Sequence, residues 1–389
     1  MFKKILLLVL KATLLVLRII LVGWFKSKQF VTARRARDGK LEKSVIDVRP
    51  LQAGKFVVFA TYPRPDIDAT MLQLLEDFHH AGAQVIVVSN QRIGDETLGA
   101  LKAFSSCIII RTNIGQDFGA YQEGYFHLTN SVDRADISKL VFLNDSIYIF
   151  SDVDHHHMVD FLLDNEKAWC GVTENFEDSY HVSSFLFSVN NQAVKSAEFD
   201  CFWRTYIPYS IRLHAIKRGE FGVSNALLKE GFFPHILYSI YNCQPFIDAI
   251  DLGRGEVFEL FSIGARDAIH TAVERRHGPT LRASKSEDAS ASDDTVSTHE
   301  KRVQFGFFNY LERKNQSHAL ALFLVEHLGA PFLKKDLAYR EVFLMSEVLR
   351  ISRNHSEQDG LAISEILRAK GNSASISGFR RILWATGLK

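Results

Sequence analysis

Runs of apolar residues alternate with an amphipathic stretch through the first part of the chain. Apolar runs at residues 56–60, 84–89, 107–110 and 140–143 predict strands that are covered on both faces. The apolar positions of residues 69–81 recur with a helical period, which predicts a helix. Strands that alternate with helices are typical of βαβ units, so we expect an α/β fold with a parallel sheet and right-handed crossovers.

After residue 145 the pattern becomes mixed and rich in aromatic residues. Residues 148–150, 168–173 and 181–189 predict strands that are interleaved with helices and suited to a pocket wall. Residues 220–230 predict a helix that ends at Gly231, because glycine commonly follows the last helical turn.

Polar residues follow three of the predicted strands. Thr61 and Tyr62 come after the strand at 56–60, Asp117 after the strand at 107–110, and Asp145 after the strand at 140–143. Ligands of open α/β sheets bind beyond the carboxyl ends of the strands, so Asp145 could reach a cation and Asp117 a sugar hydroxyl. Asp117 could instead cap a helix at 121–128, and Asp145 could be a structural turn residue.

Several short motifs share their order and spacing with a known family. They are R-x-N-x-G-x-D-F-G-A at 111–120, N-D-S at 144–146, W-C-G-V-T at 169–173, S-S-F-L-F at 183–187, F-W at 202–203, G-E-F-G-V-S at 219–224, N-Q-S-H at 315–318 and G-A-P-F-L-K at 329–334. In these motifs the sequence resembles the rhamnan synthesis protein F family over about residues 54–340. Gln316 stands where the family usually has proline, and residues 250–300 have no counterpart.

The resemblance implies a bacterial glycosyltransferase of polysaccharide and lipopolysaccharide assembly, with a GT-A-like, Rossmann-like nucleotide-sugar-binding sheet and flanking helices. It implies a nucleotide-sugar donor such as dTDP-L-rhamnose, hence rhamnosyl transfer, and a lipid-linked or growing cell-surface polysaccharide acceptor. A divalent cation near Asp145, Mg²⁺ or Mn²⁺, would neutralise the diphosphate leaving group. A non-catalytic scaffold of a polysaccharide assembly complex, and another nucleotide-sugar-using enzyme such as a phosphosugar transferase, are the alternatives.

Within this framework, individual residues receive roles. Glu220 is the candidate catalytic base, although an acidic residue in a first helical turn is also favoured by the helix dipole; Glu174 and Asp178 are alternative bases. His318 could complete the metal site with Asp145 or be an ordinary helix-face histidine. Arg111 could add charge at the diphosphate or brace a carboxylate. The candidates for binding the donor are Thr61, Tyr62, Arg111, Asn113, Gly115, Asp117, Asn144 and Ser146.

The N-terminal segment is the second informative feature. Residues 5–25 are almost wholly aliphatic, but charges interrupt the run and no A-x-A-like cleavage site follows, unlike a standard signal peptide. Lys4, Lys11 and Arg18 recur every seven residues and would form one cationic stripe toward lipid headgroups, which favours a helix lying in a membrane interface. A spanning helix and a protein-docking helix are the alternatives.

The basic residues at 34–43 would attract anionic lipid and keep that side cytoplasmic, unless this segment is an ordinary solvated linker. We therefore expect the protein at the cytoplasmic face of the bacterial inner (plasma) membrane, either peripheral or anchored by a single helix, where other polysaccharide-assembly enzymes are possible partners.

Composition agrees with this assignment. The chain of 389 residues is 47% hydrophobic, enough for a full α/β core with additions, and its net charge of +1 argues against a nucleic-acid binder. Its four cysteines are widely separated and form no CxxC pattern, so we expect reduced core residues. Three adjacent histidines, at 155–157, point in different directions on a helix, so a helix start is favoured over a metal site.

These observations divide the chain into five parts. We expect a membrane-associated helix at 1–30, a basic linker at 31–53, and the catalytic domain at 54–250. An insertion follows at 251–300, in which residues 285–301 predict a disordered loop. Residues 301–389 would complete the catalytic domain and add a helical tail. Arg275, Arg276 and His277 could touch a phosphate-bearing acceptor or form a solvated cluster.

Overall fold

The computed structural model describes residues 2–63, 66–243, 256–268, 308–371, 377–378, 381 and 383. The predictions made for Arg275, Arg276, His277 and the loop at 285–301 lie outside these residues.

An eight-stranded sheet with the strand order β1-β4-β3-β2-β5-β10-β7-β11 forms the centre of the molecule. Four neighbouring strands in it are parallel to one another, namely β2 (Gly54–Thr61), β3 (Ala83–Ser89), β4 (Ser105–Arg111) and β5 (Ile137–Asn144). This parallel core confirms the predicted α/β class, and the apolar runs that predicted its strands lie within them.

Both edges of the sheet contain antiparallel strands. β1 (Lys43–Asp47) pairs with β4, and on the other side β10 (Leu186–Asn190) pairs with β5 and with β7 (Trp169–Gly171). The last strand, β11 (His235–Ile236), is parallel to β7. The strand predicted at 181–189 is divided in the structure, since β9 (His181–Val182) pairs with β8 (Glu174–Asn175) in a separate sheet.

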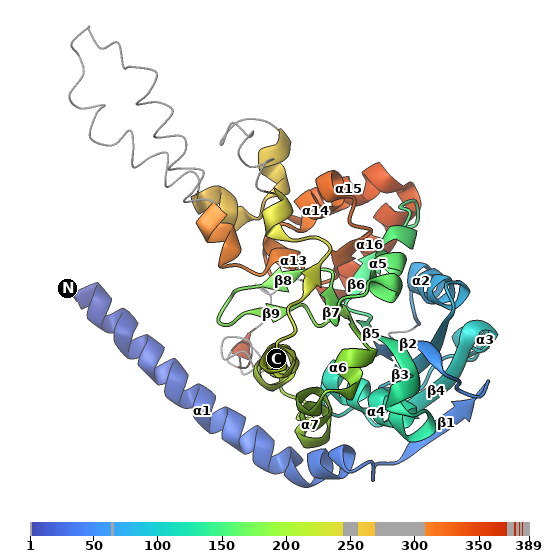
Figure 1. Ribbon diagram of the computed structural model, residues 1–389. Helices are drawn as coiled ribbons and strands as arrows, with labels where there is room; N and C mark the ends of the chain where they lie inside the picture. Colours follow the sequence, from blue (N-terminus) through green and yellow to red (C-terminus); the bar gives the residue numbers. More distant parts are fainter. Residues whose placement is uncertain are drawn as a thin grey trace, which may run out of the picture.

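Helices cover both faces of the sheet (Figure 1). The helices α2 (Ala69–His80), α3 (Asp95–Phe104) and α5 (His156–Asp164) pack on one face. The other face holds α4 (Gln116–Ser131), α6 (Asn191–Lys195), α7 (Ala197–Thr205) and α9 (Phe221–Lys229). Because successive side chains of a strand point to opposite faces, Val57 and Phe59 enter the first core while Phe56 and Val58 enter the second.

The C-terminal part packs on the first of these cores. Strand β12 (Phe332–Lys334) pairs antiparallel with β6 (Ile147–Ile149), which follows β5 directly. This pairing brings a segment almost two hundred residues away in sequence to the end of the central sheet. The accompanying helices are α13 (Gln316–Ala319), α14 (Ala321–Leu328), α15 (Met345–His355) and α16 (Glu357–Lys370).

A short irregular helical segment precedes α9. Helix α8 (Arg212–His214) leads into the π-helical turn η2 (Ala215–Glu220), and α9 starts only at Phe221. The helix predicted at 220–230 therefore exists, but Glu220 is the last residue of the π-helical turn before it. Gly231 follows the helix with a φ of 78°, as predicted for its C-terminal glycine.

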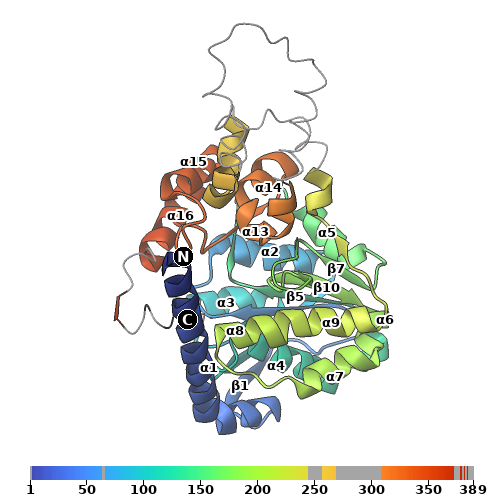
Figure 2. The ribbon, with the colours of Figure 1, turned by 90° about the vertical axis from the view of Figure 1, so that its left-hand side faces the viewer.

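Helix α1 (Phe2–Arg37) runs along one side of the molecule (Figure 2). Its last turns are held by Ala33 and Ala36, which are buried against Ile114, Tyr209 and Ile211. The expected basic linker at 31–53 is thus wrong for its first part, because this packing continues the helix to Arg37 and β1 follows. Among the described residues, no helix combines the length and the apolarity needed to cross a membrane.

The outward face of α1 is apolar along most of its length. Its exposed large side chains are Ile5, Leu6, Val9, Leu15, Val16, Ile19, Ile20, Trp24, Phe30 and Val31. Arg18 differs from the expected stripe toward lipid, because it lines a cavity on the protein side of the helix. The side chains of Lys4 and Lys11 are outside the described set.

Candidate functional site

A cavity of about 540 Å³ lies beyond the end of β5, beside the first turn of α4. Its wall includes Asp117 from α4 and both Asn144 and Ser146 from the end of β5. Glu220 from the π-helical turn and His318 from α13 complete this part of the wall. Five of the predicted site residues therefore share one cavity at the end of the parallel sheet where ligands of this fold class bind.

Asp117 is a half-buried carboxylate in this wall. Its Oδ2 accepts a hydrogen bond of 3.0 Å from Nδ2 of Asn144. Burial raises the pKa of Asp117 to about 7, and the negative charges of Asp145 and Glu220 act in the same direction while Lys334 opposes them. The helix cap is instead Gly115, whose φ of 79° is left-handed, and no side chain caps this helix. Asp117 thus faces the cavity and leaves the capping role to a glycine.

Asp145 is held by the end of β2. Its Oδ2 accepts hydrogen bonds of 2.8 Å from Thr61 Oγ1 and 2.7 Å from the backbone N–H of Tyr62. The neighbouring Asn144 binds Ser146 through its Oδ1. Asp145 is not among the residues that line the cavity, whereas its two sequence neighbours are. Thr61 and Tyr62 therefore position the carboxylate of Asp145.

Arg111 lies beneath the site and does not line the cavity. It is 5% exposed, and its guanidinium donates to Oδ1 of Asn90 at 2.9 Å and to the carbonyl oxygen of Ile114 at 2.8 Å. Burial lowers the pKa of Arg111 to about 10, which the charge of Glu123 opposes. The contact with Ile114 braces the turn that leads into α4, and the contact with Asn90 reaches the end of β3. They correct the interpretation that Arg111 faces a diphosphate or braces a carboxylate of the site.

Two further donor-binding candidates also lie away from the cavity. Asn113 is exposed on the turn. Gly115 donates its backbone N–H to Ser210 Oγ at 2.9 Å, and a Cβ at this position would lie 2.2 Å from Cβ of Pro208. The glycine therefore serves close packing of the turn and not the close approach of a ligand.

Glu220 projects into the cavity with two defined partners. Its Oε1 accepts a hydrogen bond of 2.6 Å from Ser184 Oγ, and its Oε2 lies 3.5 Å from Nε2 of His181. Nδ1 of His181 lies 2.8 Å from the carbonyl oxygen of Ser179, which assigns the Nδ1 proton to that bond. The π-helical turn sets the position of Glu220, and π-helical turns occur frequently at functional sites.

Residues of the C-terminal part and of α8 give the same cavity a positively charged wall. Lys334 donates to Ser146 Oγ at 2.7 Å, and burial lowers the pKa of this lysine. Arg340 forms an ion pair with Asp336. Burial lowers the pKa of Arg212, and the positive charge of the nearby Arg340 lowers it further. No local pattern marks these residues, although Lys334 ends the motif at 329–334.

His318 lies in the same wall, but its imidazole already contacts the carboxylate of Asp336. Its Nε2 is 3.0 Å from Oδ1 of Asp336, and burial lowers its pKa while the Asp336 contact opposes this effect. For Asp336, burial acts to raise the pKa, but the His318 hydrogen bond and the charges of Arg340 and Lys334 hold it well below its usual range. His318 thus contacts a carboxylate other than that of Asp145.

The alternative bases differ in position. Asp178 lines the cavity, in an exposed loop with a φ of 63°. Glu174 is buried and accepts hydrogen bonds from Ser239 and Tyr180, away from the cavity.

Among the three adjacent histidines, His155 contacts Asp77 and the other two are exposed. In the described part of the chain, they contribute to no cluster of three metal-ligand residues.

The parallel sheet and the polar cavity at its edge define an α/β protein with a candidate ligand site at the strand ends. Residues 85–245 match the family RgpF, rhamnan synthesis protein F, which confirms the resemblance inferred from the motifs. The matched range contains Asp117, Asp145 and Glu220.

One curated relative is the uncharacterized protein y4gN of Sinorhizobium fredii (strain NBRC 101917 / NGR234), 27% identical over 198 residues that cover 49% of this chain and 50% of the relative. The chain thus spans about half the length of this relative.

Two solved structures are similar at low identity. The glycosyltransferase GlyE of Streptococcus pneumoniae TIGR4 has 14% identity and a TM-score of 0.30, over 67% of this chain and 63% of that chain. The mannosyltransferase PcManGT of Pyrobaculum calidifontis, in complex with GDP-Man and Mn2+, has 10% identity and a TM-score of 0.29, over 92% and 97%.

Proposed function

We propose that the protein is a glycosyltransferase that moves a sugar from a nucleotide-sugar donor to a hydroxyl group of a glycan acceptor. The observation that carries this proposal is the convergence of Asp117, Asn144 and Glu220 on one cavity, within the segment that matches rhamnan synthesis protein F. The family name supports L-rhamnose as the sugar and dTDP-L-rhamnose as the donor. A lipid-linked or growing cell-surface polysaccharide would be the acceptor.

Glu220 is proposed as the base. As the acceptor oxygen bonds to C1 of the sugar, the bond from C1 to the diphosphate oxygen breaks, and the acceptor proton passes to the Glu220 carboxylate. Ser184 holds one oxygen of that carboxylate through its hydrogen bond, and His181, 3.5 Å from the other oxygen, would hold it as an imidazolium with both ring nitrogens protonated. A base that is fixed in this way needs little rearrangement when the acceptor binds.

The residues around Asp145 are compatible with a divalent cation. Thr61 and Tyr62 both bind Oδ2, so Oδ1 carries neither of these bonds. The described residues form no cluster of three metal ligands there, but Mg²⁺ and related ions are commonly held by one or two carboxylates together with substrate phosphates. When bound, the cation would neutralise charge on the leaving diphosphate.

Asp145 and Asp117 are the proposed ligands for this cation. His318 would join them only by leaving Asp336.

The positively charged wall offers a second way to bind the diphosphate. Arg212, Lys334 and Arg340 all line the cavity. Guanidinium groups bind phosphate oxygens through paired hydrogen bonds, and a lysine adds a point charge. The dependence of donor binding on metal distinguishes the two arrangements.

We also propose that α1 lies on the cytoplasmic face of the inner membrane. Its outward face is apolar, and the segment Phe2–Arg37 contains basic but no acidic residues. Replacing the exposed Val16, Ile19 and Ile20 with serine should reduce co-sedimentation with vesicles that contain anionic lipid at least several-fold. Unchanged co-sedimentation of this variant would contradict the proposal.

The central test combines binding and transfer. Nucleotide sugars are screened by thermal shift with and without Mn²⁺, on the wild type, Asp145→Ala and a control, Asp160→Ala, which removes an exposed acid on α5. We expect one nucleotide sugar to stabilise the wild type and the control in the presence of metal, but not Asp145→Ala. Metal-independent binding that is unchanged in Asp145→Ala would remove Asp145 from its role and favour the positively charged wall.

Transfer is then measured by product mass with the donor found in the screen. Glu220→Gln should keep donor binding and lose transfer by about 10²–10⁴-fold. Binding without any transfer or donor hydrolysis in the wild type would instead support the non-catalytic scaffold.

A further inference from the structure

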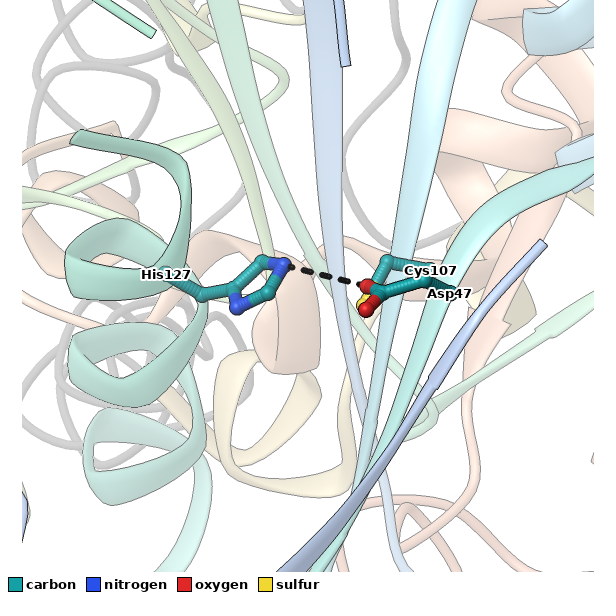
Figure 3. Close-up of side chains that lie close together, drawn as sticks. All are labelled: Asp47, Cys107 and His127. Atoms are coloured by element: carbon teal, nitrogen blue, oxygen red, sulfur yellow. Dashed lines mark ion pairs between the residues drawn. The ribbon is translucent and has the colours of Figure 1, made fainter. Parts of the chain in front are cut away.

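Three potential metal ligands meet at the edge of the sheet, far from the cavity. They are Asp47 on β1, Cys107 on β4 and His127 on α4, and Figure 3 shows the imidazole pointing toward the other two side chains. His127 is ten residues after Asp117 in the same helix, so the two lie about 15 Å apart along its axis. The cluster is therefore separate from the proposed transferase site.

The spacing of the ligand atoms suits a single metal ion. One donor atom from each residue lies within 4.8 Å of the others, and Nε2 of His127 is 3.9 Å from Oδ1 of Asp47. Two ligands of a tetrahedral zinc ion are roughly 3.3–3.7 Å apart, given the usual Zn–N, Zn–O and Zn–S bond lengths. The separation of 3.9 Å is too long for a direct hydrogen bond, and a small side-chain movement would bring both atoms to bonding distance of one ion.

The surroundings favour the metal-binding form of His127 but not that of Cys107. Burial lowers the pKa of His127, which keeps the imidazole neutral. Burial and the neighbouring Asp47 raise the pKa of Cys107 to about 12, so without metal this residue is a thiol. Binding would convert the thiol to a metal-bound thiolate and release one proton to solvent, so affinity should rise with pH.

The cluster is open to solvent on one side only. The side chain of Asp47 is 74% exposed and that of His127 is 18% exposed, whereas Cys107 is 1% exposed. A cavity of about 470 Å³, lined by Asp47, His127 and Ser131 among others, lies beside them. This space gives an ion a path in and gives water a place as the fourth ligand.

We infer that Asp47, Cys107 and His127 form a binding site for one transition-metal dication, and the donor set of one sulfur, one imidazole nitrogen and one carboxylate oxygen favours Zn²⁺. The two anionic ligands balance the charge of the ion, and the adjacent Lys43 and Glu123 neutralise each other as an ion pair. The ion would connect an edge strand to its neighbour β4 and to α4. It would thereby fasten β1, the strand that follows α1.

The test uses the full-length protein without an affinity tag, stripped of metal. Zn²⁺ binding is measured by equilibrium dialysis with elemental analysis, and Co²⁺ serves as the spectroscopic probe. We expect about one equivalent of metal per chain and a thiolate-to-cobalt charge-transfer band. Cys107→Ser should abolish the band and weaken binding at least about 100-fold. Cys201→Ser, which removes an exposed thiol on α7, is the matched control and should change neither.

Two further variants keep the test decisive. Asp47→Asn alters a largely exposed side chain, so it should fold normally and still weaken binding if the site exists. Replacing the exposed His156 and His157 with asparagine removes weak surface binding but should leave the stoichiometric site intact. Absence of stoichiometric metal, or a charge-transfer band that persists in Cys107→Ser, would overturn the inference. Because these measurements do not involve a nucleotide sugar, their outcome is independent of the proposed transferase activity.

Discussion

The ionisation of Asp117 should make the stability of the protein depend on pH in a characteristic way. Burial, with the charge of Asp145 as the second cause, raises the pKa of Asp117 from 3.8 to about 7. The folded protein therefore holds the Asp117 proton more tightly than the unfolded chain does. The resulting contribution is fully favourable below about pH 4, is lost as the pH rises through 7, and stays lost above it.

The size of this effect follows from the same numbers. A change from 3.8 to about 7 corresponds to about 4 kcal/mol at alkaline pH, at ~1.4 kcal/mol for each tenfold change in proton affinity. This value is an upper limit because the carboxylate is only half-buried and solvent screens it. Asp117→Asn removes the ionisation but keeps an oxygen that can accept the hydrogen bond from Asn144. The variant should therefore gain stability over the wild type by about 2–3 kcal/mol between about pH 5 and about pH 8.

Urea unfolding at several pH values measures this difference, and Asp160→Asn, an exposed acid on α5, is the control that should show no such trend. A stability difference between Asp117→Asn and the wild type that does not change with pH would refute the reasoning. So would a difference that grows toward acid pH, since that sign would mean that the folded protein favours the charged carboxylate.

Three other substitutions test the support of the site. Gly219→Ala places a Cβ 2.5 Å from the ring of Phe118 and should lower the free energy of unfolding in urea by about 1–3 kcal/mol. Sugar transfer should also weaken, because Glu220 is the next residue. Normal stability of this variant would contradict the packing. Arg111→Lys removes the two hydrogen bonds of a buried guanidinium and should lower the free energy of unfolding in urea by about 1–3 kcal/mol. The affinity of the folded variant for the donor should stay within about twofold of the wild type. A large selective loss of affinity would show that Arg111 takes part in donor binding. Asp359→Ala removes the acceptor of the buried Tyr148 hydroxyl and of the Ser151 hydroxyl, so it should lower the free energy of unfolding by about 3 kcal/mol and the melting temperature in calorimetry with it. An unchanged transition would show that α16 is not anchored there.

The sequence predicts the centre of this fold well, because its parallel strands are continuous apolar runs. Residues 56–60 and 140–143 alternate between two cores, so every position must be apolar and the signal is strong. The position of Asp117 after a predicted strand, and the need of a sugar transfer for a base, predict Asp117 and Glu220 as site residues, and both line the cavity. The sequence does not predict the partners of these two carboxylates, because Ser184, His181 and Lys334 come close to them only in the folded chain.

The features that the sequence analysis placed wrongly or missed can also be explained physically. Arg111 belongs to the same motif as Asp117, but its long side chain turns away from the cavity and donates a hydrogen bond to the carbonyl oxygen of Ile114 in the turn that follows β4. The positively charged wall comes from residues such as Lys334 and Arg340, which the pairing of β12 with β6 carries to the site. No local periodicity encodes that pairing. The continuation of α1 to Arg37 likewise depends on a contact of Ala33 with distant residues.

Helix α4 explains how the site can keep an unfavourable charge. Its first turn presents Asp117, and the next residue, Phe118, stacks at 6.3 Å from Trp203 in an aromatic cluster that fills this side of the sheet. Gly124 lies so close to β2 that a Cβ would be 2.5 Å from Val58, which leaves the helix no room to shift. With α4 packed this closely on β2, Asp117 stays buried beside Asp145, and burial together with this like charge raises its pKa at a cost to stability. The cation proposed for this site would relieve the repulsion between the two carboxylates when bound, so part of the cost of burying them would be recovered as binding energy.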